Sequence, residues 1–223
     1  MGENRTYGQR CGLALSLDLL GERWTLLVIR ELARGPKRFG DLQSGLNGIG
    51  TNLLSARLKS LAAEGIVEKV KLPPPASATA YALTDRGRSL QPILEDLAVW
   101  GYGMIGTFGQ QPDLETRAAW AAMTMKVFMD RADAAPPVGI YGFRVGEEAF
   151  WLRVTADGSE LLDGRSPVRP DVDAEMDTDS FFALATGATG LKDSSAVING
   201  DREKLEKLIR TFRLPLPAGD TNP

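Results

Sequence analysis

The sequence predicts an α+β protein of two domains: a winged helix-turn-helix followed by an α/β sandwich with an antiparallel sheet. From residue 39 to residue 70 the pattern runs helix, tight turn, helix and strand, which is the order of a winged helix-turn-helix. The run 101–112, GYGMIGTFGQQP, contains four glycines and predicts a domain boundary. Beyond it, helical and alternating strand-like segments follow one another. We therefore expect domains at residues 1–108 and 113–217.

Two helices are expected before the helix-turn-helix. Residues 11–20 repeat leucine along one side, and residues 24–33 place Trp24, Leu27, Val28 and Leu32 at helical spacing. The second of these helices is expected to end near Gly35 and Pro36. Its apolar residues are typical of a core.

The helix-turn-helix itself is defined by leucine periodicity and a glycine-rich turn. Its first helix aligns Phe39, Leu42 and Leu46, and residues 47–50, Asn-Gly-Ile-Gly, tolerate the positive φ of a sharp reversal. The second helix, residues 51–64, repeats leucine at 54, 58 and 61. Gly65 is placed for a left-handed cap, and a strand is expected over residues 66–70.

The outer face of the second helix is small, polar and cationic. A step of about 100° per residue places Asn52, Ser55, Ala56 and Lys59 opposite the leucines. Asn, Ser and Lys are side chains that can contact base edges in a major groove, whereas Arg57 on the flank is better placed for a phosphate. An ordinary solvated helix face is the alternative.

The segment after the strand predicts a projecting hairpin wing, because its three prolines cannot donate ladder hydrogen bonds. Phosphate contacts are also expected from the loop before the first helix, although a solvated loop is an equal alternative there. The full set of candidate DNA-binding residues is Lys37, Arg38, Thr51, Asn52, Ser55, Arg57, Lys59, Lys69, Lys71 and Ser77.

A further helix is expected from Thr84, its N-cap, through Trp100. It carries a wide apolar stripe of Leu90, Ile93, Leu94, Leu97 and Trp100. Such a stripe needs a partner, so a second subunit is expected to cover it, with packing inside a monomer as the alternative.

Several blocks in register resemble the HxlR-type winged-helix regulators of bacteria: Trp24-Thr25-Leu26-Leu27, Arg30-Glu31-Leu32, residues 35–39, residues 54–59 and Tyr81-Ala82-Leu83-Thr84. The match spans residues 11–101. It implies a sequence-specific DNA-binding regulator, here a repressor, that forms a homodimer through its first and last helices. About a hundred residues follow the usual domain, which departs from the family pattern.

Cys11 begins the first helix, where exposed amides favour a thiolate. The resemblance implies a sensor of oxidants or electrophiles at this position in some members. The alternative is a small buried side chain at a helix-packing surface. With one cysteine per chain, no second thiol can resolve an oxidised Cys11 within the chain.

The C-terminal half is predicted to be helix, strands, helix, edge strand and helix. A helix over 114–131 is apolar on most sides, strands are expected at 138–145, 149–154 and 160–162, and an acidic segment follows. A short helix at 180–185, an edge strand at 196–200 and a last helix from Asp201 to Phe212 complete the order.

This order, with Phe150-Trp151-Leu152-Arg153, residues 181–187 and Ile198-Asn199-Gly200-Asp201, is similar to sterol-carrier-protein-like domains. The resemblance implies an apolar tunnel for a lipid-like effector. The alternative is a filled core. Candidate ligand-binding residues are Met125, Phe128, Met129, Phe143, Phe150, Trp151, Phe181 and Phe182.

The composition of the chain limits which other classes of function are expected. Residues 1–108 hold 13 Lys and Arg against 10 Asp and Glu, a net charge of +3, and the rest hold 13 against 19, a net of −6. The chain has no histidine, no nucleotide-binding glycine motif and no nucleophile elbow, so we expect no enzyme, cofactor or metal site. With no run of 18 apolar residues and no apolar leader, we expect a cytoplasmic protein. The rival function is a lipid-binding carrier that does not bind DNA.

Overall fold

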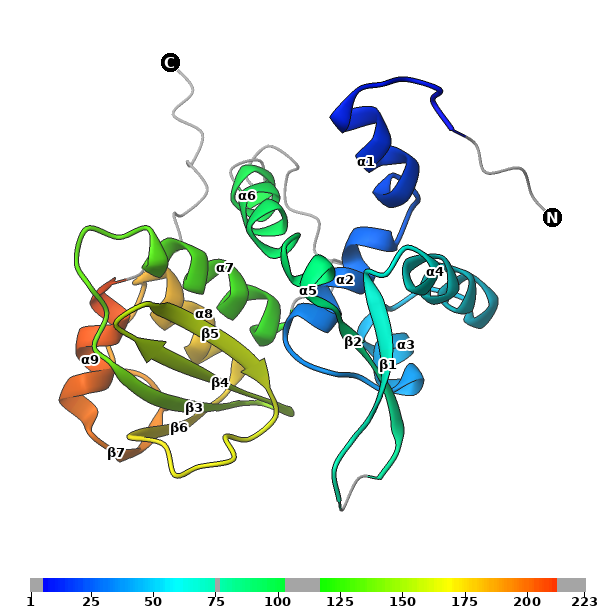
Figure 1. Ribbon diagram of the computed structural model, residues 1–223. Coiled ribbons are helices and arrows are strands. Elements are labelled where there is room, and N and C mark those ends of the chain that lie inside the picture. The colour runs from blue at the N-terminus through cyan, green and yellow to red at the C-terminus, as the bar shows by residue number, and fades with distance from the viewer. Residues whose placement is uncertain (1–5, 75–76, 103–116, 212–223) are drawn as a thin grey trace. The chain divides into compact units, whose positions relative to one another are not determined.

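The computed structural model describes residues 6–74, 77–102 and 117–211, which form two compact units, Met1–Leu94 and Glu95–Pro223 (Figure 1). The division falls inside one helix, α6 (Gln91–Tyr102). Most of the expected glycine-rich boundary, the start of the 114–131 helix and the end of the last helix lie outside the described residues. Each unit is described by itself.

The first unit is a winged helix-turn-helix, which confirms the predicted fold. Its elements are α1 (Gly12–Leu20), α2 (Thr25–Ala33), α3 (Phe39–Gly45), α4 (Thr51–Ala63), β1 (Val67–Lys71), β2 (Thr79–Leu83) and α5 (Asp85–Arg88). Leucines 42, 54, 58 and 61 are buried with Val28 and Ile29 in one core. The strands β1 and β2 pair antiparallel, with Val67 opposite Leu83 and Lys69 opposite Tyr81.

The predicted continuous helix from residue 84 to residue 100 is wrong, because the chain breaks between α5 and α6. Thr84 caps α5 as expected, its hydroxyl accepting the Gly87 N–H at 3.1 Å. Pro92 has no N–H to donate to the carbonyl of Arg88, and its ring would clash with that carbonyl in a continuous helix. The second helix therefore starts afresh at Gln91.

Helix α4 is held at its C-terminal end by side chains from the segment after the wing. Gly65 adopts φ +65°, the left-handed conformation expected of it. The Arg86 guanidinium donates to the Glu64 carbonyl at 2.9 Å, and the Thr84 hydroxyl donates to the Gly65 carbonyl at 2.6 Å. These bonds satisfy carbonyls that a helix terminus leaves without intrahelical partners.

A buried carboxylate, Glu31 on α2, organises the cations of the first unit. Only 1% of its side chain is exposed, and its carboxylate forms ion pairs with Arg34 at 2.6 Å, Arg30 at 2.9 Å and Lys37 at 3.0 Å. Burial opposes its ionisation, but the charges of Arg34, Lys37 and Arg30 outweigh burial and lower the pKa of the carboxyl to about 2. Glu31 is therefore charged across the physiological range.

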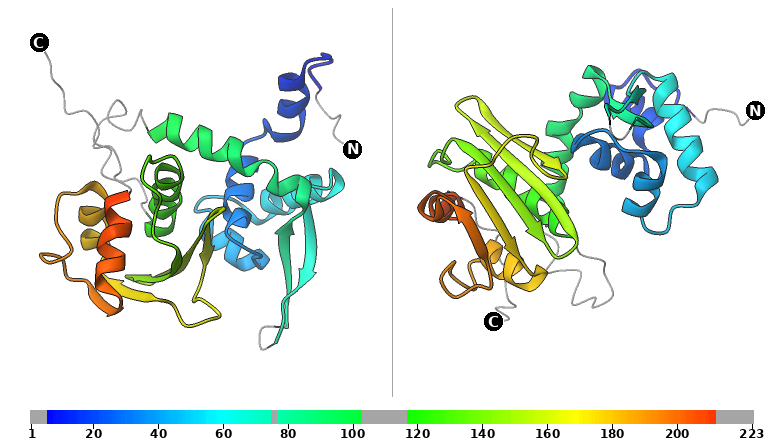
Figure 2. Two further views of the ribbon diagram at one scale, coloured as in Figure 1. Left: turned by 60° about the vertical axis from the view of Figure 1, so that its left-hand side comes forward. Right: turned by 90° about the horizontal axis from the view of Figure 1, so that it is seen from below.

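The second unit packs helices on a five-stranded sheet (Figure 2). Its elements are α7 (Ala118–Asp130), β3 (Gly139–Val145), β4 (Glu148–Thr155), β5 (Gly158–Asp163), β6 (Val172–Met176), α8 (Thr178–Thr186), β7 (Val197–Gly200) and α9 (Arg202–Thr211). In Figure 2, α7 in green, α8 in gold and α9 in red-orange lie on one face of the sheet. One apolar core joins the three helices to that face.

The sheet is mixed rather than antiparallel, which corrects the predicted topology. The strand order is β5-β4-β3-β6-β7, and β3 pairs parallel with β6 while the other neighbours are antiparallel. The internal strand β6, between β3 and β7, was not expected, because the acids in Val172-Asp-Ala-Glu-Met176 look like a solvated loop. Its apolar residues 172, 174 and 176 are buried, and Asp173 and Glu175 alternate with them on the other face.

Replacing Glu31 with Gln is expected to lower the free energy of unfolding by about 3–5 kcal/mol, because three clustered cations lose their charged partner in a buried site. Urea unfolding at pH 7 measures the loss. The matched change Glu22→Gln removes a carboxylate that is 62% exposed, and should cost about 1 kcal/mol or less.

The lowered pKa of Glu31 makes the free energy of unfolding depend on pH. The unfolded chain takes up the Glu31 proton first, so the stabilisation is complete above pH about 4.5 and declines as the pH falls towards 2. Glu31→Gln should therefore lose less stability than the wild type over this window. Equal acid sensitivity in the two proteins would contradict the assigned role of Glu31.

Candidate nucleic-acid interface

The outer face of α4 is exposed along its length. Asn52, Ser55, Ala56 and Lys59 are exposed, and Leu54, Leu58 and Leu61 on the opposite side are buried. A helix carries such a pair of faces when its apolar residues recur every three or four positions. The helix thus presents one amide, one hydroxyl and one ammonium group on a surface otherwise made of small side chains.

Two candidate residues on α4 are engaged inside the unit. Arg57 donates from Nη2 to the Glu22 carboxylate at 2.7 Å and from Nε to the Arg23 carbonyl at 3.2 Å. Thr51 accepts a hydrogen bond at 2.9 Å from Gln43 on α3. Both contacts fix α4 against preceding segments, so Arg57 is a positioning residue in this structure rather than an unoccupied phosphate ligand.

The loop before α3 contains Lys37 and Arg38, which the structure uses differently. The Lys37 ammonium is bound to Glu31, and its backbone exchanges two hydrogen bonds with Tyr81 on the wing, at 2.9 and 2.8 Å. Arg38 is exposed at the N-cap of α3, and its N–H donates to the Asp41 carboxylate at 3.1 Å. Of the two, Arg38 is the more accessible side chain.

A groove between α4 and the wing gathers residues that are distant in sequence. Its volume is about 360 Å³, and it is lined by Phe39, Ser55, Leu58, Lys59, Ala62, Lys69 and Tyr81. The Lys69 ammonium lies 5.8 Å from the centre of the Tyr81 ring, a cation–π distance. Within the described residues, neither Lys59 nor Lys69 forms an ion pair with a carboxylate. The groove therefore presents two positive charges that no acid neutralises.

The wing places its remaining candidates at the surface. Lys71 and Ser77 are exposed, and Lys71 lies on the same side of β1 as Lys69 because strand residues alternate. Ser77 has φ +35°, and its N–H donates to the Pro73 carbonyl at 3.3 Å. Residues 75 and 76 at the tip lie outside the described residues.

Three further residues hold this surface in place, and sequence reasoning did not assign that role to them. Trp24 has φ +78° and its ring faces the turn of the helix-turn-helix, where a side chain on Gly48 would meet it at 3.7 Å. Glu22 binds Arg57, and Tyr81 lines the groove. Only Tyr81 carried a signal, its position opposite Lys69 in a hairpin; the other two contacts depend on tertiary structure.

Comparison with known proteins identifies the first unit. The HxlR-like helix-turn-helix family matches residues 19–107. YvaP of Bacillus subtilis strain 168, described as an uncharacterised HTH-type transcriptional regulator, is 35% identical over 85 residues, covering 38% of this chain and 79% of YvaP. The chain belongs to the HxlR-like helix-turn-helix family.

Other HxlR-like similarities cover the same part of the chain. The HTH-type transcriptional regulator YodB of Bacillus subtilis strain 168 is 36% identical over 85 residues, covering 38% of this chain and 76% of YodB. The solved structure of the reduced form of YodB from B. subtilis has 32% sequence identity to this chain. The match covers 48% of this chain and 100% of the YodB chain, with a TM-score of 0.37.

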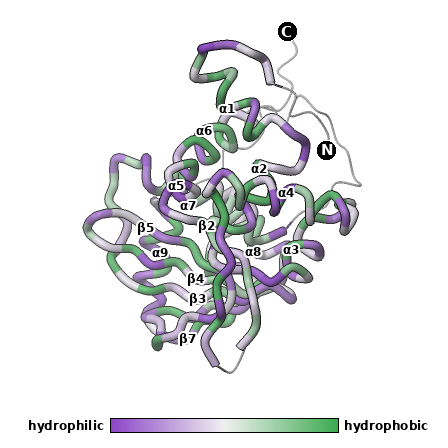
Figure 3. Tube along the Cα trace, turned by 45° about the vertical axis from the view of Figure 1, so that its right-hand side comes forward, coloured by the Kyte–Doolittle hydropathy of each residue, from purple (hydrophilic) through white to green (hydrophobic). Residues whose placement is uncertain are grey.

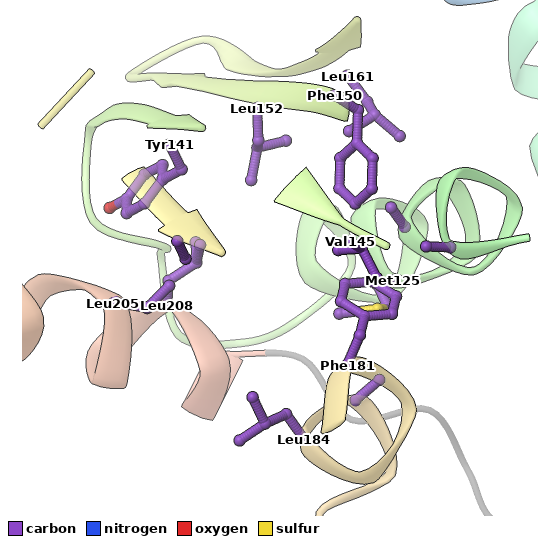
Figure 4. Packing of buried hydrophobic residues seen from close by; sticks show 14 of the residues in the cluster. Met125, Tyr141, Val145, Phe150, Leu152, Leu161, Phe181, Leu184, Leu205 and Leu208 are labelled. Carbon is purple, nitrogen blue, oxygen red and sulfur yellow. The ribbon is translucent and has the colours of Figure 1, made fainter. Parts of the chain in front are cut away.

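The second unit contains an apolar cavity between its sheet and its helices. The free volume is about 40 Å³, and Figure 4 shows Met125, Phe150, Leu161 and Phe181 converging on this core from α7, β4, β5 and α8. The full lining is Ala122, Met125, Lys126, Met129, Phe143, Phe150, Leu152, Leu161, Met176, Phe181, Leu184, Ala185, Leu205, Leu208 and Ile209. Five of the eight candidate ligand residues are among them.

The other three candidates lie elsewhere. Trp151 points to the opposite face of the sheet from Phe150 and Leu152, because neighbouring side chains on a strand alternate. Phe128 and Phe182 are partly buried and pack against the same core without lining the cavity. The helical spacing of Phe128 relative to Met125 and Met129 turns it away from the cavity.

Cys11 is exposed at the N-cap of α1. The backbone N–H groups of Ala14 and Leu13 face the thiol and lower its pKa below the usual value. This placement differs from a buried cysteine at a packing surface.

Two carboxylates of the second unit, Glu148 and Asp177, cap helices. Glu148 accepts the N–H groups of Ala118 and Ala119 at 2.9 and 3.2 Å, and Asp177 accepts the N–H of Ser180 at 2.6 Å. Over the described ranges, no cluster of three or more His, Cys, Asp or Glu could hold a metal ion. In the same part of the chain, no helix has the length and apolar character needed to cross a membrane.

Proposed function

We propose that this HxlR-family transcriptional regulator binds duplex DNA by inserting α4 into the major groove. The exposed polar face of α4 carries this proposal. Asn52 is suited to bidentate contact with adenine, and Ser55 and Lys59 are suited to base edges or phosphate. The cations that would compete for these roles, Arg57 and Lys37, are bound to carboxylates of the protein itself.

The groove between α4 and the wing supports a backbone contact beside the base contacts. Lys59 and Lys69 line it from opposite elements, and Lys71 continues the positive charge along β1. A duplex carries one negative charge per about 1.7 Å of its axis, so charges placed this way release counterions on binding. A regulator bound in this manner occludes the DNA it covers, which favours repression.

The exposed leucines of α1 support a homodimer. Leu13 is 69% exposed, Leu15 56% and Leu17 41%, and Ala14 is the one buried residue of this nine-residue helix. Figure 3 shows the hydrophobic residues along α1. A helix with this much exposed apolar surface is stabilised by a partner, and a second copy of the chain is the partner that places two α4 helices on one duplex.

The second unit is proposed to be a sterol-carrier-like module that binds an apolar effector. The cavity lined by Met125, Phe150 and Phe181 supports this role. A binding site for a small molecule is typically apolar with a few polar groups. A carrier that never binds DNA is the rival function, and the mobility shift described below decides between them.

Redox control through Cys11 is a second candidate function, favoured by the exposure of its thiol and its lowered pKa. A thiolate is the reactive form of cysteine towards oxidants and electrophiles. Because the chain has one cysteine, a disulfide would join two chains or one chain and a small thiol.

Asn52→Ala is expected to weaken operator binding by about 1–3 kcal/mol and to relax selectivity at one base position. Lys59→Ala should reduce the salt dependence of binding by about one counterion if its partner is phosphate. Salt-dependent mobility shifts with genomic fragments measure both. Lys192→Ala, an exposed lysine of the second unit, is the control. Unchanged operator affinity in both α4 variants would contradict the recognition-helix assignment.

Leu13→Glu combined with Leu17→Glu should convert a dimer to monomers, because two carboxylates replace apolar contacts at the proposed interface. Sedimentation equilibrium measures the dissociation constant, and a shift of at least tenfold is expected. Ser16→Glu on the same exposed helix is the control. A wild-type chain that sediments as a monomer at operator-binding concentrations would refute the dimer.

A quinone or diamide is expected to change the operator affinity of the wild type and to leave Cys11→Ser unaffected. Mobility shifts measure the operator affinity of both proteins, and mass spectrometry of the modified chain locates the adduct. An equal response of the two proteins places the sensor elsewhere.

A further inference from the structure

We propose that Arg23 binds a DNA phosphate on the strand opposite to the one that the wing contacts, so that the protein holds both backbones beside α4. This rests on the proposed insertion of α4 into the major groove. The observation that carries it is the position of Arg23, which is exposed and stacked on Trp24 at the flank of α4 away from the wing.

Helix α4 has two different flanks, one on each side of its exposed polar face. Ser55 and Lys59 line the groove shared with the wing and form one flank. Arg57 follows Ser55 by two residues, which turns it about 160° round the helix at 3.6 residues per turn. Arg57 donates from Nε to the Arg23 carbonyl at 3.2 Å, so this second flank is bonded to the segment before α2. The wing and residues 22–24 therefore border α4 on opposite sides.

A helix in the major groove meets both strands of the duplex. Its diameter of about 10–12 Å fills a groove about 12 Å wide. The two walls of the groove are the sugar-phosphate backbones of opposite strands, so each flank of the helix faces a different strand. With the wing against one strand, Arg23 faces the other.

The guanidinium of Arg23 lies over the Trp24 ring, 5.4 Å from the ring centre. Stacking uses the flat face of a guanidinium and leaves the N–H groups at its edge available to two oxygens of one phosphate. Among the described residues, no carboxylate forms an ion pair with Arg23. The stack therefore orders the side chain and leaves it the donors that a phosphate needs.

Trp24 is itself fixed against the turn of the helix-turn-helix. Its backbone has φ +78°, which is rare for a bulky residue. Its ring lies where a side-chain carbon on Gly48 would meet it at 3.7 Å. Gly48 precedes the start of α4 by three residues. The ring under Arg23 is thus positioned by the same turn that leads into the recognition helix.

The charges of this flank distinguish Arg23 from Arg57. The carboxylate of Glu22 is paired with Arg57 at 2.7 Å, and the Arg57 side chain is only 18% exposed. That pair cancels its own charge inside the protein. The charge of Arg23 is left to a phosphate.

The first test measures the salt dependence of operator binding by the full chain. One phosphate contact on duplex DNA contributes about 0.9 to the slope of log K against log salt, so Arg23→Gln should reduce the slope by about that much and weaken binding roughly three- to tenfold near physiological salt. Arg23→Lys retains the charge and should retain the slope. Thermal melts establish that the variants fold.

Arg88→Gln is the matched control. It removes an arginine charge from α5 of the same unit, where Arg88 is paired with Asp85 at 2.6 Å, and should leave the slope unchanged. The phosphate contact is overturned by an unchanged slope in Arg23→Gln or by an equal fall in Arg88→Gln. A slope lost equally in Arg23→Lys indicates a structural role of the stack and also overturns it.

The second test locates the strand, using operators with a neutral methylphosphonate at one position at a time. The position at which Arg23→Gln causes no further loss of affinity marks the phosphate that Arg23 binds. The same scan with the double variant Lys69→Gln, Lys71→Gln marks the phosphates of the wing. We expect the two sets on opposite strands of one half-site. Both sets on one strand, or no such position for Arg23→Gln, overturns the proposal.

Asn52→Ala separates this inference from the proposed function. If Asn52→Ala weakens operator binding and Arg23→Gln does not, α4 remains the recognition helix and the Arg23 contact alone is overturned. A wild-type chain that binds no duplex overturns both.

Discussion

The geometry of the DNA-binding unit depends on the buried carboxylate of Glu31. An isolated buried charge is strongly unfavourable, so Glu31 requires its cations, and each cation brings a segment of chain with it. Arg34 ends α2, and Lys37 carries the loop into α3 and is bonded to the wing at Tyr81 through its backbone. Gly45 at the end of α3 leaves room for the carboxylate, since a side-chain carbon there would lie 3.1 Å from Glu31 Oε2. One charge thus relates α2, α3 and the wing.

This arrangement separates cations that hold the fold from cations that face solvent, and the sequence alone could not separate them. In the sequence, Lys37 and Arg57 look the same as Lys59 and Lys69: each is a cation in or beside the helix-turn-helix or the wing. Their partners, Glu31 and Glu22, are 6 and 35 residues away and are set by tertiary packing. The periodicity of α4 did predict which side of that helix is exposed, because burial of three leucines fixes the helix rotation. Local pattern therefore determined the face, and long-range packing determined which charges remain available on it.

In the second unit, too, local sequence pattern predicted only some of the strands. Alternation predicted β3, β4 and β5, but β6 was concealed because two of its five residues are acidic and only one face is buried. The alternation of side chains along β4 also decides which aromatic residue lines the core. Phe150 and Trp151 are adjacent, so only one of them can face the helices. Their order within the block was visible in the sequence, but the face that the helices cover was not.

The core of the second unit combines stiff and adaptable sides. Phe150 stacks on Phe143 with ring centres 5.4 Å apart and meets Phe181 edge to face at 5.8 Å, a geometry that fixes β3, β4 and α8 together. The side towards α7 is lined by Met125, Met129 and the Lys126 stem. A molecule entering the cavity therefore displaces α7 side chains more readily than the aromatic cluster.

Helix α6 contributes residues to both units. In the first unit, Leu94 on α6 and Leu90 just before the helix pack against the helix-turn-helix core. In the second unit, its Glu95 and Asp96 pair with Lys126 and Arg131 on α7. An effector alters DNA affinity only to the extent that it binds two arrangements of the protein with different affinity. The apolar contact of Leu94 and the ion pair of Glu95 lie on successive residues of one helix, so α6 is the element through which such a difference would have to pass.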